Sequence, residues 1–233
     1  MAQHTQHEAG HKRGRTVLAA SFAVAGLAIA GAGVFAGLNA TASNTTAETV
    51  SSGTLKLVMA NNGVGFGQNI TNVAPGDVVN RYVDVTDNGT LDAQNLTLRA
   101  TDATPTKLTT DATNGLHATV KLCTNATGVV SATWTTAGLC QGVDAATGLI
   151  PTNGTITTVV SNVALSALSS AQTLVSGAVT KNSAYHYQVS VTLPDQNETT
   201  TNGTLPAGTI QGLSAALTWT FDEAQRAATT TSS

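Results

Sequence analysis

From residue 52 onward, apolar residues alternate with polar ones at a period of two. In residues 184–193, Tyr, Val and Leu fill every second position, with His, Gln, Ser and Thr among the residues between them. Similar alternation recurs in five other segments, at 55–59, 83–85, 95–99, 118–122 and 216–221. A period of two with one polar face is typical of antiparallel strands that cover a shared core. The pattern therefore predicts an all-β chain.

Turn signals separate these segments at the short intervals typical of a β-sandwich. Asn-Gly dipeptides stand at residues 88–89, 114–115, 153–154 and 202–203. We expect one antiparallel β-sandwich of jelly-roll type over residues 43–226, with a disordered tail at 227–233. One stretch, Ala164–Leu174, is also compatible with a short helix.

The N-terminus has the order of a secretory signal. A basic segment at residues 12–15 precedes an uncharged run from Val17 to Leu38. The basic charges stay on the cytoplasmic side while the apolar run enters the membrane, as export requires. Small residues offer a signal peptidase a cleavage site after Ala36 or Ala42. We therefore predict a signal-peptide helix within residues 1–42 and a secreted, extracellular or cell-surface protein.

The apolar run also permits a different reading. Its 22 residues are enough to span about 30 Å of hydrocarbon as a helix, so an uncleaved anchor is the alternative. The run is rich in Gly and Ala and hence only weakly apolar, which favours cleavage. Contact with a membrane is then expected only through the uncleaved signal.

The charge of the exported part excludes one class of partner. Beyond Ala42 there are seven Lys or Arg against twelve Asp or Glu, a net charge of −5. Without a basic stripe, a nucleic-acid partner is not expected. Charged residues make up 10% of the chain. A surface with so little charge is weakly self-repelling, which permits packing against further copies.

Cys123 and Cys140 are the two cysteines of the chain, and both lie in the exported part. In an oxidising compartment such a close pair predicts a disulfide. Trp134 lies between them in sequence. We expect Trp134 to pack beside the disulfide; the alternative is that it carries recognition of a ligand.

Catalytic motifs are missing from the exported sequence. Its two histidines, His117 and His186, are not in a His-Glu-x-x-His arrangement, and we expect both to be exposed on strands. Asp84, Asp87 and Asp92 flank an Asn-Gly turn without the spacing of a calcium loop, so we interpret them as solvated carboxylates around a hairpin. We predict no catalytic residue, no metal and no cofactor.

Several short motifs resemble one known family in their order along the chain. Ser52–Leu57 reads Ser-Gly-Thr-Leu-Lys-Leu, Ala74–Asp77 reads Ala-Pro-Gly-Asp, and Phe221–Gln225 ends in Ala-Gln. With the Gly/Ala-rich signal, this order resembles the TasA/camelysin family of exported Gram-positive proteins, whose signals are cut by a SipW-type peptidase. The segment Cys123–Cys140 resembles the actinobacterial branch.

The resemblance implies a jelly-roll subunit that polymerises into extracellular fibres of a biofilm matrix, with itself or related matrix subunits as partners. It also implies that the freed N-terminal segment adds as a strand to a neighbouring subunit. The apolar residues of that donor are few: Leu38, Ala40, Ala42, Ala47 and Val50. The alternatives are an adhesion or binding module and, least favoured because the zinc motif is missing, a camelysin-type metallopeptidase.

Overall fold

The computed structural model describes residues 52, 54–62, 66, 73–196, 198–199 and 201–229. The predicted signal peptide, both cleavage sites, the donor segment and the last four residues of the predicted tail lie outside this part of the chain. None of the helices in the described part is long and apolar enough to span a membrane.

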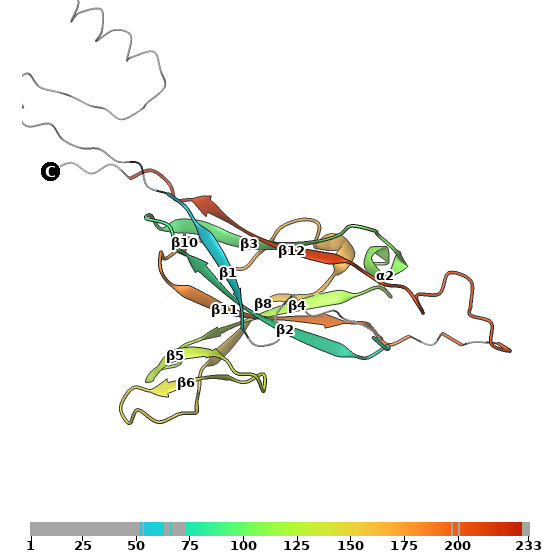
Figure 1. Cartoon of the computed structure of the whole chain (residues 1–233), viewed down its shortest axis with the longest axis horizontal. Coiled ribbons are helices and arrows are strands. Elements are labelled where there is room, and N and C mark those ends of the chain that lie inside the picture. The colour runs from blue at the N-terminus through green and yellow to red at the C-terminus, as the bar shows by residue number, and fades with distance from the viewer. Residues whose placement is uncertain are drawn as a thin grey trace, which may run out of the picture. The chain divides into compact units, whose positions relative to one another are not determined.

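The larger sheet contains five antiparallel strands. Their order across the sheet is β1 (Leu57–Asn61), β2 (Val78–Asp87), β11 (Ala184–Thr192), β4 (His117–Thr124) and β8 (Thr155–Ala164). The alternating segments at 83–85, 118–122 and 184–193 thus become neighbours, because each turns one apolar row toward the same side. β11 occupies the centre of the sheet between β2 and β4 (Figure 1).

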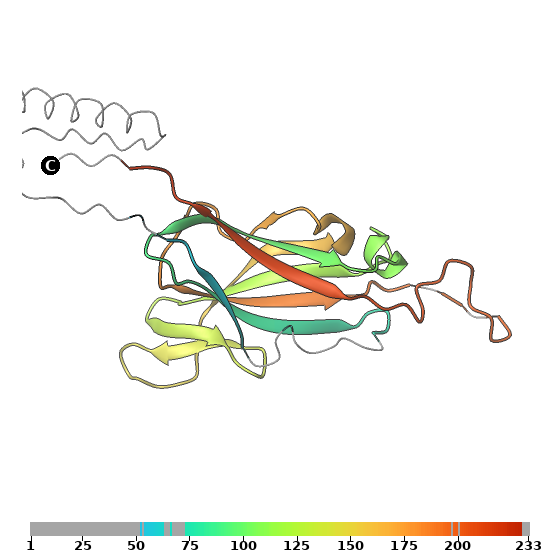
Figure 2. The ribbon, with the colours of Figure 1, turned by 45° about the horizontal axis from the view of Figure 1, so that its top comes forward.

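A smaller antiparallel sheet covers one face of the first. Its order is β10 (Ala178–Val179), β3 (Ala93–Asp102) and β12 (Leu217–Gln225), and β9 (Gln172–Thr173) also pairs with β3. The chain passes from one sheet to the other between β2 and β3 and again between β3 and β4. The predicted all-β, antiparallel sandwich is confirmed. In Figure 2, β12 runs diagonally along one side of the sandwich.

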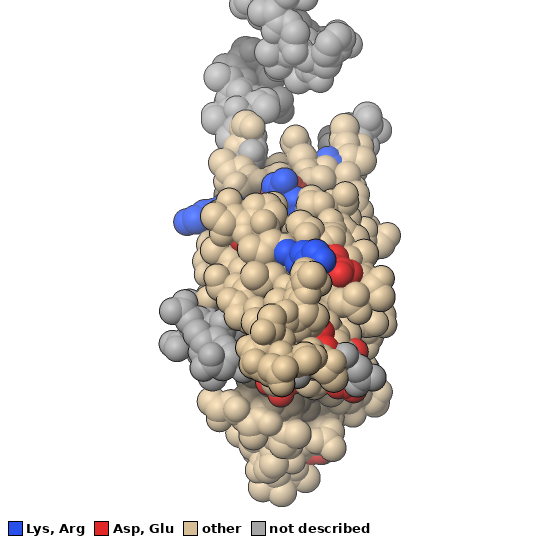
Figure 3. Space-filling model, turned by 90° about the vertical axis from the view of Figure 1, so that its right-hand side faces the viewer, with Lys and Arg blue, Asp and Glu red and all other residues tan. Residues whose placement is uncertain are grey.

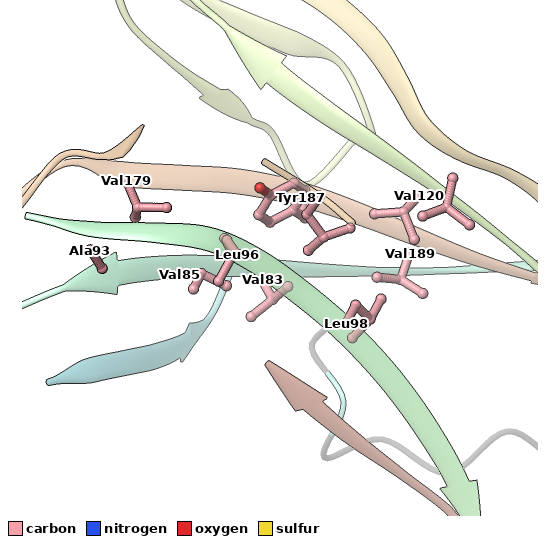
Figure 4. Packing of buried hydrophobic residues seen from close by; sticks show 11 residues of the cluster. Val83, Val85, Ala93, Leu96, Leu98, Val120, Val179, Tyr187 and Val189 are labelled. Atoms are coloured by element: carbon pink, nitrogen blue, oxygen red, sulfur yellow. The ribbon is translucent and has the colours of Figure 1, made fainter. Parts of the chain in front are cut away.

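The main core lies between these two sheets. It is formed by apolar side chains that are almost fully buried: Val83, Val85, Leu96, Leu98, Val120, Tyr187 and Val189, with Ala93, Val160, Leu174 and Val179 around them. Figure 4 shows the labelled members of this cluster, among them Val83, Leu98 and Tyr187, in the space between the two sheets. The alternation in the sequence therefore identifies the inward row of each of these strands.

A second apolar cluster fills the other end of the sandwich. Leu116, Leu165, Leu168, Val191 and Ile210 are among its buried members. Two short helices lie in the described part, α2 (Lys107–Thr110) and the 3-10 helix η1 (Leu165–Ala167). The alternative of a helix across residues 164–174 is wrong beyond η1, since residues 172–173 pair with β3 as β9.

A third small sheet covers part of the outer face of the larger one. It contains β5 (Val129–Trp134), β6 (Cys140–Asp144) and β7 (Thr152–Asn153). Trp134 of β5 is buried in one cluster with Tyr82 of β2 and Cys123 of β4. Gly154 permits this close approach, because a Cβ there would lie 2.7 Å from both the Cys140 Sγ and the Thr124 carbonyl oxygen.

The surface carries few charges, as the composition predicts. Figure 3 shows one face on which most of the area belongs to neither basic nor acidic residues. Arg99 and Asp222 form an exposed ion pair with a distance of 2.9 Å between nitrogen and oxygen. Exposed pairs of this kind contribute little to stability, so apolar packing and backbone pairing dominate the fold.

Candidate functional site

β12 has an unpaired backbone edge within the described part of the chain. It pairs with β3 in regular register from Leu217 to Asp222, and the register shifts between Asp222 and Ala224. No other described strand pairs with β12. The unpaired edge of a strand presents N–H and C=O groups that an extended peptide can satisfy. β12 is therefore a candidate acceptor for an added strand.

The two outer strands of the larger sheet are less suitable acceptors. Pairing of β8 with β4 is irregular on both sides of Val120, and Asn162 of β8 has a φ of +46°. Bulges of this kind bend and twist an edge, which protects it from further pairing. β1 at the opposite side has only 5 residues. The uninterrupted run Leu217–Asp222 distinguishes β12.

The side chains that β12 turns toward the core are large but only partly buried. Leu217, Trp219 and Phe221 alternate with threonines and pack at the margin of the core. The ring of Phe66 stacks on Trp219 with centroids 5.3 Å apart. Tyr187 of the larger sheet lies 6.3 Å from Phe221 between centroids. The incomplete burial leaves apolar surface next to an unpaired edge.

The inward rows of β2 and β12 both end in a carboxylate. Val83, Val85 and Asp87 are each 0% exposed. On β12 the row continues past Phe221 to Glu223, whose two carboxylate oxygens are inaccessible to solvent. Burial of Glu223 and, to a lesser extent, the nearby charge of Asp87 raise the pKa of Glu223. Two acidic side chains thus face the interior at one end of the sandwich.

The interpretation of Asp84 and Asp87 as solvated carboxylates around a hairpin is wrong. β2 and β3 belong to different sheets, so the Asn88–Gly89 turn begins a crossing between sheets and directs Asp87 inward. Its Oδ1 accepts a hydrogen bond from the Gly89 amide at 2.7 Å. Asp84 is half-buried and bonded to His186, whereas Asp92 is exposed, as expected.

The predicted disulfide between Cys123 and Cys140 is confirmed. The two Cα atoms lie 5.5 Å apart, and both cysteines are almost fully buried. The bond joins β4 of the larger sheet to β6 of the small third sheet. It therefore attaches the β5–β6 hairpin covalently to the sandwich.

Trp134 packs beside this disulfide, as the sequence predicts. It is 3% exposed and lies in the same cluster as both cysteines. Its ring centroid is 5.8 Å from that of Tyr82, and its Nε1–H donates to the His186 carbonyl at 3.0 Å. An indole buried in this way anchors the hairpin and offers no exposed face for recognition.

His186 is not the exposed residue that its polar neighbours in sequence indicate. Its side chain is 22% exposed, and its Nδ1 lies 2.6 Å from Asp84 Oδ1 and 3.2 Å from Thr133 Oγ1. Asn62 Nδ2 donates to Thr133 Oγ1 at 2.9 Å. A catalytic triad needs the hydroxyl and the carboxylate on opposite ring nitrogens. Here both contact the same nitrogen, so the cluster is a polar crosslink between strands.

His117 begins β4, as expected, but is also half-buried. Its Nε2 lies 3.1 Å from the Ala112 carbonyl oxygen, and its Nδ1 lies 3.2 Å from Asn162 Oδ1. His117 therefore links the loop before β4 to the edge strand β8.

Comparison with known families decides the relationship of this chain to other proteins. Residues 11–230 match the family described as camelysin metallo-endopeptidase. The chain belongs to the camelysin family. The predicted resemblance is thereby confirmed over nearly the whole chain. No curated protein matches it significantly.

The camelysin family's description implies a metal, and the described residues do not fit one. Within the described ranges, no group of three or more His, Cys, Asp or Glu residues lies close enough to hold an ion. His117 pairs with Thr192 and His186 with Cys123, which separates the histidines by about 20 Å along the sheet. Both cysteines form the disulfide, so neither thiol is available as a metal ligand.

Some features of the β12 edge and its surroundings could not be found from the sequence. The alternation of Leu217, Trp219 and Phe221 predicts a strand, and its continuation to Glu223 was the available signal for a carboxylate in the same row. Nothing local indicates that Asp87 lies near Glu223. Likewise, the contact between Phe66 and Trp219 joins residues that are distant in sequence.

Proposed function

We propose that this camelysin-family protein is a secreted structural subunit that assembles outside the cell by strand addition. The acceptor is the unpaired edge of β12, and the donor is the N-terminal segment of another copy or of a related subunit. The main observation in support of this proposal is the partly buried row of Leu217, Trp219 and Phe221 beside that edge. An added strand satisfies the backbone and covers the apolar surface in one step.

The composition of the donor suits this acceptor. Leu38, Ala40 and Ala42 fall at every second position, so in an extended strand they share one face. Small side chains fit opposite a row that already contains two aromatic rings. Ala47 and Val50 add apolar residues further along the segment. Backbone pairing therefore supplies most of the affinity, and the side chains set the register.

In this proposal the signal peptidase controls assembly as well as export. A SipW-type peptidase that cuts after Ala36 leaves Leu38, Ala40 and Ala42 on the mature protein. A cut after Ala42 removes all three. The position of the mature N-terminus thus determines whether the segment can act as a donor strand. The proposal assigns no catalytic role, no cofactor and no nucleic-acid partner to the protein.

Electron microscopy and sedimentation of two mature forms test this proposal. Protein that begins at Gly37 is expected to form fibres, and protein that begins at Ser43 is expected to remain monomeric. If the form that begins at Gly37 stays monomeric at high concentration, or if both forms polymerise equally, strand donation by this segment is refuted.

A pair of matched substitutions tests the face of the donor. Ala40→Asp places a charge on the row that contacts the acceptor, and Thr41→Asp places the same charge on the opposite face. Fibre formation is expected to be lost only in Ala40→Asp. Equal loss in both variants would indicate a general effect of charge.

One observation favours a second candidate function, a surface adhesion module. Leu149 and Ile150, in the loop between β6 and β7, are 67% and 68% exposed. Exposed apolar residues at a loop can mark a binding surface. A screen against glycans and surface proteins would support adhesion if a ligand bound wild type but not Leu149→Asp/Ile150→Asp. Binding unaffected by these changes would exclude this loop.

A further inference from the structure

Four Asn-Gly dipeptides lie wholly within the described part of the chain, and one of them differs from the others in its surroundings. They are residues 88–89, 114–115, 153–154 and 202–203. An asparagine before glycine can lose its side-chain amide, because glycine has no Cβ to obstruct attack by its backbone nitrogen on that side chain. The attack requires a glycine amide that is accessible to water and a backbone that is free to rearrange.

The glycine amides of three dipeptides are held in place. Gly89 donates to Asp87 Oδ1 at 2.7 Å, and Gly115 and Gly154 each donate to a backbone carbonyl oxygen at 3.0 Å. Gly89 and Gly115 are buried, and Gly154 is partly buried. A Cβ added to any of the three would lie 2.4 to 2.7 Å from its nearest neighbouring atom. These sites therefore lack both the access to water and the space for rearrangement.

The turn Thr201–Thr204 lacks these constraints. All four of its residues are exposed. The Gly203 amide has no hydrogen-bond partner among the described residues, and a Cβ at Gly203 would meet no atom within 4 Å. An isolated bridge closes the turn: the amides of Thr201 and Thr204 donate to each other's carbonyl oxygens at 3.0 and 2.9 Å. Asn202 and Gly203 have φ values of +51° and +77°, which a two-residue turn of this kind requires.

The segment that carries this turn is fixed at its base. It joins β11 to β12, and Figure 1 and Figure 2 both show it extending beyond the end of the sandwich. The carboxylate of Glu198 accepts hydrogen bonds from Thr209 Oγ1 and, at 3.1 Å, from the Ile210 amide. Gln196 Nε2 donates to the Asn114 carbonyl oxygen at 2.6 Å. The exposed turn can therefore rearrange without disturbing the core.

We propose that Asn202 is a site of spontaneous deamidation, and that the fold protects the asparagines of the other three dipeptides from the same reaction. Water takes the proton of the Gly203 amide, and the nitrogen forms a bond to Asn202 Cγ. The bond between Cγ and Nδ2 breaks, ammonia leaves, and a succinimide ring remains. Water then opens the ring at either of its carbonyl carbons, which gives aspartate or isoaspartate. The net reaction consumes water and converts a neutral amide into a carboxylate and ammonium.

The products differ from the parent turn in charge and in backbone length. Either product adds a negative charge to a surface that carries few charges, since charged residues make up 10% of the chain. Isoaspartate also inserts a methylene group into the backbone between Thr201 and Thr204. The hydrogen bonds of the bridge then no longer match a two-residue turn. Aged protein is therefore expected to contain a more acidic form with an altered segment between β11 and β12.

The dipeptides at 153–154 and 202–203 form a matched pair within the chain. Both are flanked by threonine on each side, so the local sequence gives them the same intrinsic reactivity. Peptide mapping by mass spectrometry of mature protein incubated at mildly alkaline pH tests the proposal. In folded protein, Asn202 is expected to convert at least about tenfold faster than Asn153, because an exposed turn opens at little cost in free energy. In denaturant, the two rates are expected to converge.

Equal rates at Asn202 and Asn153 in the folded protein would overturn the proposal, as would a difference that persists in denaturant. Isoelectric focusing provides a second test. Asn202→Gln is expected to abolish the more acidic form, because glutamine would have to close a larger and less favoured ring. Asn153→Gln is the matched control and is expected to retain it. An acidic form that accumulates unchanged in Asn202→Gln would place the modification elsewhere and refute the proposal.

Discussion

The indole Nε1–H of Trp134 donates a hydrogen bond to the backbone carbonyl of His186 at a distance of 3.0 Å. This bond joins the hairpin β5–β6 to β11, the central strand of the larger sheet. Together with the disulfide, it holds the small third sheet against the sandwich. The hairpin is therefore anchored both covalently and by a buried polar contact.

Trp134→Phe is expected to destabilise the protein by about 1–2 kcal/mol, because the ring is largely retained but the His186 carbonyl loses its donor. Trp134→Ala is expected to cost about 3–5 kcal/mol, since it also leaves a cavity. Denaturant unfolding measures both values. Trp219→Phe, at a partly buried site, serves as the control and should cost less than Trp134→Ala. A neutral Trp134→Phe would show that the hydrogen bond contributes nothing.

Reduction of the Cys123–Cys140 disulfide is expected to lower the free energy of unfolding by roughly 3 kcal/mol, from the chain-entropy model for a loop of this length. Reductant should have no such effect on the double variant Cys123→Ala/Cys140→Ala. In amide exchange, the hairpin should lose protection before Val120 and Val189, which lie in the separate main core. Simultaneous loss at all these sites would contradict an independently anchored hairpin.

Asp102 is expected to make the protein sensitive to acid. Burial opposes ionisation of Asp102, but hydrogen bonds from Thr104, Thr109 and Ala216 outweigh it and lower the pKa below the ordinary 3.8. The stability it contributes is present above 3.8 and is lost as pH falls through the lowered value.

Asp102→Asn should therefore flatten the acid limb of the unfolding curve and cost about 1–3 kcal/mol at neutral pH. Asp195→Asn, at an exposed position, is the control. It should change neither the acid limb of the unfolding curve nor the free energy of unfolding at neutral pH. An unchanged acid limb in Asp102→Asn would contradict the prediction.

Assembly at β12 is expected to change the environment of Trp219. The chain has two tryptophans, so Trp134→Phe leaves Trp219 as the sole indole reporter. On fibre formation its emission should shift to shorter wavelength and its quenching by acrylamide should decrease, because the added strand covers the partly buried row. Trp134 in a Trp219→Phe background should change little, since it is already 3% exposed. Fibres in which Trp219 is quenched as in the monomer would place the interface elsewhere.

The local pattern of the sequence determined the class of fold and the identity of the strands. Tyr187, Val189 and Val191 alternate with polar residues, and side chains two positions apart in a strand must share a face. The two cysteines, in a chain with an export signal, likewise predicted their own pairing, because thiols this close in sequence pair readily under oxidising conditions. These inferences need only the geometry of the backbone and the chemistry of nearby residues.

The tertiary structure alone decided which faces and charges are buried. His186, Gln188 and Ser190 look like a solvent face, yet Gln188 and Ser190 are almost fully buried and His186 is half-buried, since the chain packs on both faces of β11. Asp87 is 0% exposed although it precedes an Asn-Gly turn, because the chain crosses there from β2 in one sheet to β3 in the other. Periodicity establishes that a strand has two faces, but long-range packing determines what covers each of them.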